Sequence, residues 1–221
     1  MKLTIGVMGA SGGDLSEEIK QRAYRLGETI AERDATLITG GCPGLPYEAV
    51  RGAKAKGGLV IGISPGLSVG EHQGKYRSPV EGFDVLIFTG SGLMGREITN
   101  IRSCDIVVIA GGRSGTLGEL AIAYDEGRLI GILTGTGGIT GMVEEIIRVC
   151  KKDTGACVLY DDDPSLLIDR LIEYYHSEYA GALLLPRRSC QPVAMATIES
   201  ADGHDEDRSG LTGGTDEASD D

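Results

Sequence analysis

The sequence predicts an α/β fold in which a parallel sheet of about seven strands lies between two layers of helices. Short apolar runs alternate with longer amphipathic segments along most of the chain. The apolar runs lack a polar residue at every second position, which is typical of strands that are buried on both faces. Several runs end in a glycine-rich turn that leads into a helix, so we expect right-handed crossover connections.

Each expected strand is a short apolar run bounded by glycine, proline or polar residues. These runs are Leu3–Met8, Ala35–Thr39, Leu59–Ser64, Asp84–Phe88, Ile106–Ala110, Leu129–Leu133 and Ala156–Tyr160. The segments between and after them carry apolar residues at helical spacing, which predicts six or seven helices. The expected helices begin at a capping box formed by Asp14 and Glu17, at Pro46, and at Leu93, Thr116, Gly141 and Pro164.

The segment 67–83 shows no strong periodicity and carries mixed charges. We expect it to form a long connection beside the functional edge of the sheet. It contains His72 and Tyr76, and a place in an exposed loop is favoured for both side chains over a role in binding a ligand.

The net charge of −12 is unevenly distributed over the 221 residues. Residues 199–221 hold nine acidic side chains and one basic side chain, a net charge of −8, which leaves −4 for residues 1–198. From about Pro186 onward the periodicity is lost. We therefore expect one domain over residues 1–180 and an acidic, disordered tail over residues 181–221. An acidic surface also argues against binding to nucleic acid.

Cysteine usage and hydropathy favour a cytoplasmic protein. The five cysteines show no C-x-x-C spacing, so we expect reduced thiols rather than disulfides or zinc ligands. The three histidines are widely separated, and no metal centre is expected. There is no stretch of 18 apolar residues and no basic-then-apolar N-terminus, so we expect neither a membrane contact nor a secretion signal.

The most informative stretch is residues 105–119, which read D-I-V-V-I-A-G-G-R-S-G-T-L-G-E. A buried strand is followed here by a glycine turn and by the start of a helix, an arrangement that binds phosphate groups. Gly111, Gly112 and Gly115 allow the backbone to approach a ligand closely. The first N–H groups of the helix that begins at Thr116 have no intrahelical acceptor and are free to bind an anion. Glu119 follows one turn later.

A structural interpretation stands beside the functional one. Thr116 and Glu119 also fit a capping box, in which their side chains satisfy the free N–H groups of the helix start. In that case the two residues stabilise the helix and leave no anion site.

Glycine-rich loops follow three of the expected strands, and parallel strands bring such loops to one edge of the sheet. We therefore expect Gly9, Ser11, Gly40 and Gly41 to help bind a nucleotide-like ligand through its phosphate. The first loop, residues 9–12, does not match G-x-G-x-x-G, and no acidic residue ends the second strand, so no dinucleotide cofactor is expected. A plain turn between strand and helix is the other interpretation of this loop.

The ordered part of the chain resembles the LOG (Lonely Guy) family of phosphoribohydrolases, which act on cytokinin riboside 5′-monophosphates, and the wider superfamily with a Rossmann-like fold. That superfamily includes proteins labelled "lysine decarboxylase" and the molybdenum cofactor carrier protein. The resemblance rests on M-G-R-E at residues 94–97, A-G-G-R-S-G-T-L-G-E at residues 110–119, the loop at residues 40–44 and the strand at residues 60–63.

Three departures from the family pattern point to a divergent branch. Ala110 stands where the family has proline, Glu97 replaces a lysine, and the glycine loop is one residue longer. No lysine lies in a setting typical of a pyridoxal phosphate anchor, so no cofactor is expected.

The resemblance implies that Arg96 and Glu119 occupy catalytic positions. The implied reaction cleaves the N-glycosidic bond of a nucleoside 5′-monophosphate, such as AMP, to give the base and ribose 5-phosphate. Gly111, Gly112, Gly115 and Thr116 would hold the phosphate. We expect the helix N-terminus to keep Glu119 ionised at neutral pH. The alternative is a non-catalytic carrier or sensor of a nucleotide or of a ligand like the molybdenum cofactor. The family also implies a homodimer.

Overall fold

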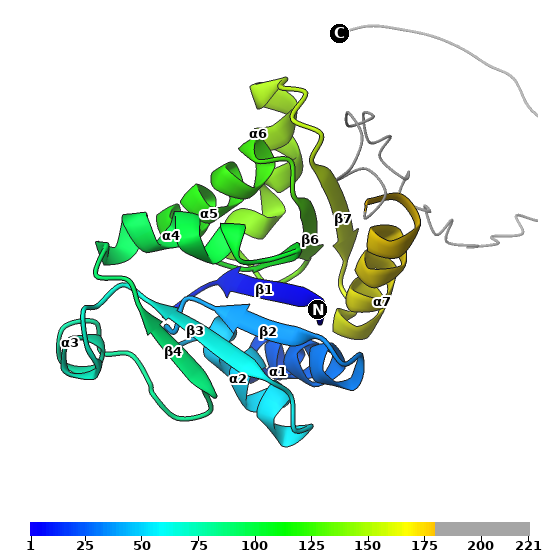
Figure 1. Ribbon diagram of the computed structural model, residues 1–221. Coiled ribbons are helices and arrows are strands. Elements are labelled where there is room, and N and C mark those ends of the chain that lie inside the picture. Colours follow the sequence, from blue (N-terminus) through cyan, green and yellow to red (C-terminus); the bar gives the residue numbers. More distant parts are fainter. Residues whose placement is uncertain (180–221) are drawn as a thin grey trace, which may run out of the picture.

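The structure of the protein is a computed structural model that describes residues 1–179. It forms one parallel sheet with helices on both faces, which confirms the predicted three-layer α/β fold (Figure 1). The expected tail, residues 181–221, lies outside the described residues.

All seven predicted strands are present, and their bounds differ from the expected ones by only a residue or two. They are β1 (Thr4–Gly9), β2 (Thr36–Thr39), β3 (Val60–Ser64), β4 (Val85–Phe88), β5 (Ile106–Ala110), β6 (Leu129–Leu133) and β7 (Cys157–Asp161). The order in the sheet is β4-β3-β2-β1-β5-β6-β7, and every neighbouring pair is parallel. The order reverses between β1 and β5, where ligands bind in open sheets of this kind.

The helices follow the strands as expected, with one addition. They are α1 (Glu17–Glu32), α2 (Leu45–Ala55), α3 (Val69–Gly74), α4 (Gly92–Arg102), α5 (Ser114–Asp125), α6 (Val143–Cys150) and α7 (Pro164–Tyr174). A 3₁₀ turn, Gly138–Gly141, precedes α6, and a π-helical turn, Tyr175–Tyr179, follows α7. The capping box expected at Asp14 is absent, because Ser16 caps α1 and its hydroxyl accepts a hydrogen bond from the Ile19 N–H group.

Two apolar cores lie on opposite faces of the sheet. Val7 packs into the core beneath α1, α2 and α7, and its neighbour Met8 packs into the core beneath α4, α5 and α6 (Figure 1). Adjacent residues of a strand point to opposite faces, so β1 contributes to both cores. Both faces of the central strands are therefore buried, which explains the continuous apolar runs in the sequence.

The connection at residues 67–83 is more ordered than expected, because it contains the short helix α3. His72 lies in this helix with no exposed surface, so the expectation of an exposed loop position was wrong. Its Nδ1 atom lies 2.8 Å from the Ser64 hydroxyl and its Nε2 atom 2.9 Å from the Pro79 carbonyl oxygen. Both ring nitrogens are thus occupied by structural hydrogen bonds.

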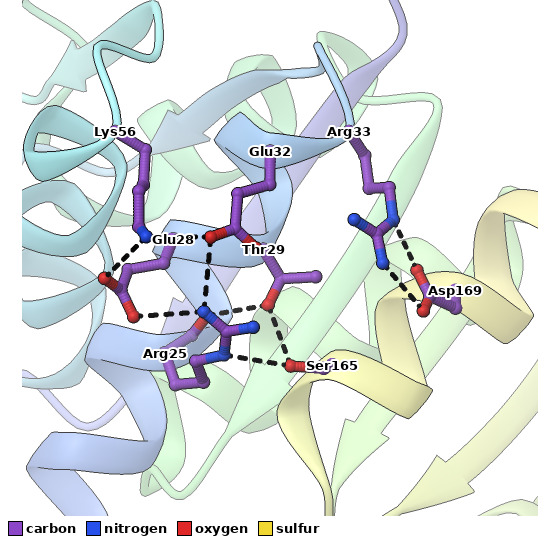
Figure 2. A network of polar contacts seen from close by, with 8 residues as sticks. All are labelled: Arg25, Glu28, Thr29, Glu32, Arg33, Lys56, Ser165 and Asp169. Carbon is purple, nitrogen blue, oxygen red and sulfur yellow. Dashed lines mark hydrogen bonds and ion pairs between the residues drawn. The ribbon is translucent and has the colours of Figure 1, made fainter.

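A polar network on the outer surface joins α1 to α2 and α7 (Figure 2). Arg33 forms two parallel hydrogen bonds with Asp169, at 2.7 and 3.0 Å, and Arg25 donates to the Ser165 hydroxyl. Lys56, the C-cap residue of α2, pairs with Glu32 at 2.9 Å. This network lies on the opposite side of the sheet from α4 and α5, and it ties the elements of one layer together.

Among the cysteines that the structure describes, the expectation of a reduced thiol was wrong for Cys157. Cys42, Cys104 and Cys150 are free thiols, whereas Cys157 is disulfide-bonded. Spacing along the chain cannot show such a bond, because a disulfide depends on the distance between two Cα atoms in the fold. No helix within residues 1–179 has the length and apolar character needed to cross a membrane.

Candidate functional site

A pocket of about 530 Å³ opens at the carboxyl ends of the strands, next to the point where the strand order reverses. Its walls come from the loops that follow β1 and β2, from the first two turns of α4, and from the start of α5. These segments are far apart in the sequence and meet because the strands are parallel. The pocket therefore lies where the glycine loops were predicted to converge.

The start of α5 opens directly into this pocket. The helix begins at Ser114, two residues earlier than expected, and no side chain caps it. Residues 113–116 line the pocket, so the start of the helix, where the first N–H groups have no intrahelical acceptor, borders it. An uncapped helix N-terminus is a favourable place for an anion.

The predicted capping box of Thr116 and Glu119 does not form. Because the helix begins at Ser114, Thr116 already belongs to the first turn and Glu119 to the second, too far along to cap the first residues. Gly112 precedes the helix with a φ of +97°, and a Cβ atom there would overlap the Thr116 side chain. The Glu119 side chain therefore does not cap the helix, and it lines the pocket, as the functional interpretation requires.

Arg96 and Glu119 form an ion pair inside the pocket. The Arg96 Nη1 atom lies 3.6 Å from the Glu119 Oε1 atom, and both side chains are less than one-tenth exposed. Helix α4 supplies the arginine and α5 the glutamate, so the pair joins two elements that were expected to share the site. The buried Nε atom of Arg96 has no hydrogen-bond partner among residues 1–179, although most buried polar groups in proteins are hydrogen-bonded.

Burial has the largest effect on the pKa of the Glu119 carboxyl. It raises the pKa of this carboxyl to about 7, against the opposing effect of the Arg96 charge, and the nearby Glu97 adds to the rise. The expectation that the helix N-terminus keeps Glu119 ionised at neutral pH was therefore wrong, since a carboxyl with a pKa of about 7 is only about half ionised there. A carboxyl group with a pKa near 7 can both accept and donate a proton under physiological conditions.

Glu97 is a further carboxylate in the pocket, and its burial was not foreseen from the sequence. It is only 6% exposed and lines the pocket next to Arg96. Burial raises its pKa, and the Arg96 charge opposes this rise. The replacement of a lysine by Glu97 was visible in the sequence, but the packing of α4 against α5 that buries the side chain was not.

Cys42 also lines the pocket and was not predicted to belong to the site. Burial raises the pKa of its thiol to about 11, since the favourable effect of the Arg96 charge is smaller. The thiol therefore stays protonated at neutral pH and is a poor nucleophile.

The structure brings most of the predicted site residues together. Seven of them line the pocket: Gly9, Ser11, Gly40, Arg96, Gly115, Thr116 and Glu119. Three others, Gly41, Gly111 and Gly112, lie in the same turns but do not line it. The Gly41 and Gly111 N–H groups donate to the hydroxyl groups of Thr39 and Thr136 at 3.1 and 2.8 Å.

The family model of the SLOG cluster4 family matches residues 2–168 of the chain. The chain belongs to the SLOG cluster4 family. The resemblance noted from residues 94–97 and 110–119 is thereby confirmed, because those motifs lie inside the matched region.

Relatives of this SLOG chain share most of its described length. A protein from Archaeoglobus fulgidus, described as uncharacterized, is 38% identical over 157 residues, which cover 68% of this chain and 96% of that protein. The molybdenum cofactor binding protein from the phototrophic bacterium Rippkaea orientalis is 29% identical with a TM-score of 0.66, over 80% of this chain and 99% of that one. The molybdenum cofactor carrier protein from Chlamydomonas reinhardtii is also 29% identical, with a TM-score of 0.65, over 80% and 100%.

Proposed function

We propose that this SLOG protein binds a nucleotide-like ligand in the pocket through a phosphate group at the start of α5. The observation that carries this proposal is the uncapped N-terminus of α5 beside the buried guanidinium of Arg96. Backbone N–H groups and a guanidinium group are the two donors that proteins use most effectively for phosphate oxygens. At about 530 Å³ the pocket is also within the range usual for small-molecule sites.

The reaction we propose is hydrolysis of the N-glycosidic bond of a nucleoside 5′-monophosphate. With the phosphate held by α5, Glu119 faces the attached ribose. The ionised carboxylate stabilises the positive charge that develops on the ribose as the base departs with the electron pair of the C–N bond. The same carboxylate takes a proton from the water molecule that attacks C1′ and returns it to the departing base, so that the products are the free base and ribose 5-phosphate.

Incubation of the purified chain with AMP, IMP, GMP or CMP, followed by an assay for ribose 5-phosphate, tests this reaction. Release of ribose 5-phosphate by the wild-type chain and its loss in Glu119→Ala support hydrolysis. Glu18→Ala provides a matched control, because Glu18 is an exposed carboxylate on α1. Binding of a monophosphate without turnover, unaffected by Glu119→Ala, contradicts the hydrolase and leaves the binding proposal standing.

A second candidate function is that of a non-catalytic carrier or sensor. Two observations favour it: the relatives from Rippkaea and Chlamydomonas are named for molybdenum cofactor binding and transport, and Glu97 replaces the lysine of the hydrolase pattern. In this case Arg96 and the α5 start hold the ligand and Glu119 fixes the orientation of Arg96. The small molecule that copurifies with the chain, identified by mass spectrometry, distinguishes the molybdenum cofactor from a nucleotide.

We also propose that two copies of the chain associate beside the pocket and that the protein acts in the cytoplasm without binding nucleic acid. Leu93, Met94 and Ile98 of α4 are exposed, as is Leu117 of α5, and the first two line the mouth of the pocket. Sedimentation analysis tests the association: a dimer that Ile98→Lys dissociates supports it, and a monomeric wild-type chain contradicts it.

A further inference from the structure

Glu97 is a buried carboxylate that has no partner of its own. It is 6% exposed, it lines the pocket, and no hydrogen bond or close ion pair joins it to another residue within 1–179. The Glu97 carboxyl oxygens are not among the fully buried atoms that lack a partner, so they remain accessible from the pocket. A ligand component in the pocket can therefore contact them.

The first two turns of α5 are shaped around this carboxylate. A Cβ atom on Gly118 would lie 3.0 Å from the Glu97 Oε2 atom, closer than side chains normally pack, and one on Gly115 would lie 3.7 Å from the Oε1 atom. Glycine is a poor helix former, so its use at both positions is unfavourable for α5 itself. The bare helix surface lets the Glu97 carboxylate lie against the first two turns of α5, in the same pocket that the start of the helix lines.

This arrangement brings two negative groups close together once a phosphate is bound. A monophosphate carries up to two negative charges, whereas the pocket offers one buried guanidinium that is already paired with Glu119. In the hydrolase pattern a lysine stands at position 97 and would supply a positive charge. Here position 97 adds a negative charge instead, and the other arginine of the pocket lining, Arg113, is exposed to solvent, so an added cation would offset the repulsion between Glu97 and the phosphate.

We propose that Glu97 is the protein ligand of a divalent cation, of the size and hardness of Mg²⁺, which enters the pocket together with the phosphate ligand. The cation bridges a Glu97 oxygen and a phosphate oxygen, and water molecules complete its coordination. Mg²⁺ is typically bound in this way, through one or two carboxylates and the phosphate groups of a substrate. No group of three or more potential metal ligands exists within residues 1–179, so the cation is bound only when the phosphate is present. This inference rests on the proposed phosphate site.

Calorimetric titration of the full chain with AMP, in buffer that contains either excess MgCl₂ or EDTA, tests the proposal. We expect AMP to bind about tenfold or more tightly with Mg²⁺, because the cation replaces a repulsion between like charges by two attractions. MgCl₂ titrated alone should give no binding. In Glu97→Gln, which keeps the shape of the side chain, the affinity for AMP should be the same in both buffers, whereas the exposed-site control Glu18→Gln should behave as wild type.

If the wild-type chain binds AMP with equal affinity in both buffers, the proposed cation is ruled out and the proposed phosphate site still stands. If AMP binds in neither buffer, the proposed function fails and this inference fails with it. A second measurement uses only the wild-type chain, so it does not depend on whether Glu97→Gln folds. Free Mn²⁺, followed by its paramagnetic resonance signal, should decrease more when protein and AMP are added together than the separate additions of AMP and of protein account for. A decrease with protein alone, or no decrease beyond that caused by AMP alone, contradicts the proposal.

Discussion

The guanidinium group of Arg96 lies directly against the α-carbon of Gly40. A Cβ atom on Gly40 would overlap the Arg96 Nη1 atom, so only glycine leaves room for this side chain to reach Glu119. The loop after β2 thus contributes to the site through the space that Gly40 leaves for the Arg96 guanidinium group.

This contact predicts that Gly40→Ala displaces Arg96 and weakens the binding of AMP by about tenfold or more, because a charge-assisted hydrogen bond to phosphate is lost. Calorimetric titration measures the affinity. Gly12→Ala is the matched control, since Gly12 lies in a neighbouring loop and a Cβ atom there meets nothing within 4 Å. Equal affinity of both variants would mean that Arg96 does not bind the phosphate.

Because no side chain caps α5, a substitution that caps it should stabilise the fold and weaken ligand binding. Serine is a favoured N-cap residue, so Arg113→Ser should stabilise the fold by about 0.5–1 kcal/mol. It should also weaken AMP binding, because the serine hydroxyl accepts hydrogen bonds from the N–H groups that the phosphate needs. Arg113→Gln removes the same charge without a good cap and serves as the control. Urea denaturation and calorimetric titration measure the two effects. If both variants bind AMP alike, the helix start is not the phosphate site.

The raised pKa of Glu119 predicts how hydrolysis depends on pH. If the ionised carboxylate is the active form, the rate of ribose 5-phosphate release should increase with pH and reach half of its maximum near pH 7. Glu119→Gln should be inactive at every pH and still bind AMP. A wild-type rate that does not change between pH 5 and pH 8 would be incompatible with this role.

The same pKa predicts a change in stability. The folded chain keeps the Glu119 proton up to about pH 7, whereas the unfolded chain releases it near the ordinary value of 4.5. Between these pH values the folded state binds more protons, so the contribution of Glu119 to the free energy of unfolding decreases as the pH rises. Relative to wild type, Glu119→Gln should therefore gain about 2–3 kcal/mol between pH 4.5 and pH 7. Urea denaturation at several pH values measures this gain, and a constant difference would show that the pKa is not raised.

Much of the fold could be predicted because its signals are local. The runs at residues 106–110 and 129–133 are apolar throughout, and a strand buried on both faces requires that pattern. The glycine loops marked the correct edge of the sheet, since parallel strands bring such loops together. The positions of Arg96 and Glu119 in one pocket were expected from the family pattern, and the pocket contains both.

Features that depend on contacts between distant segments could not be predicted. The burial of His72 depends on partners at Ser64 and Pro79, which no periodic pattern reveals. The early start of α5 follows from the turn at Gly112, whose neighbour Gly111 is hydrogen-bonded to Thr136 of a later loop. The raised pKa of Glu119 results from burial, which requires the packing of α4 against α5.

A crystal structure of the full chain soaked with AMP and MgCl₂ would show where the phosphate binds. We predict that the phosphate accepts hydrogen bonds from the N–H groups of residues 114–116 and from Arg96, with the ribose facing Glu119. A phosphate bound elsewhere, or an empty pocket with the Glu119 carboxylate turned onto the backbone of α5, would contradict it.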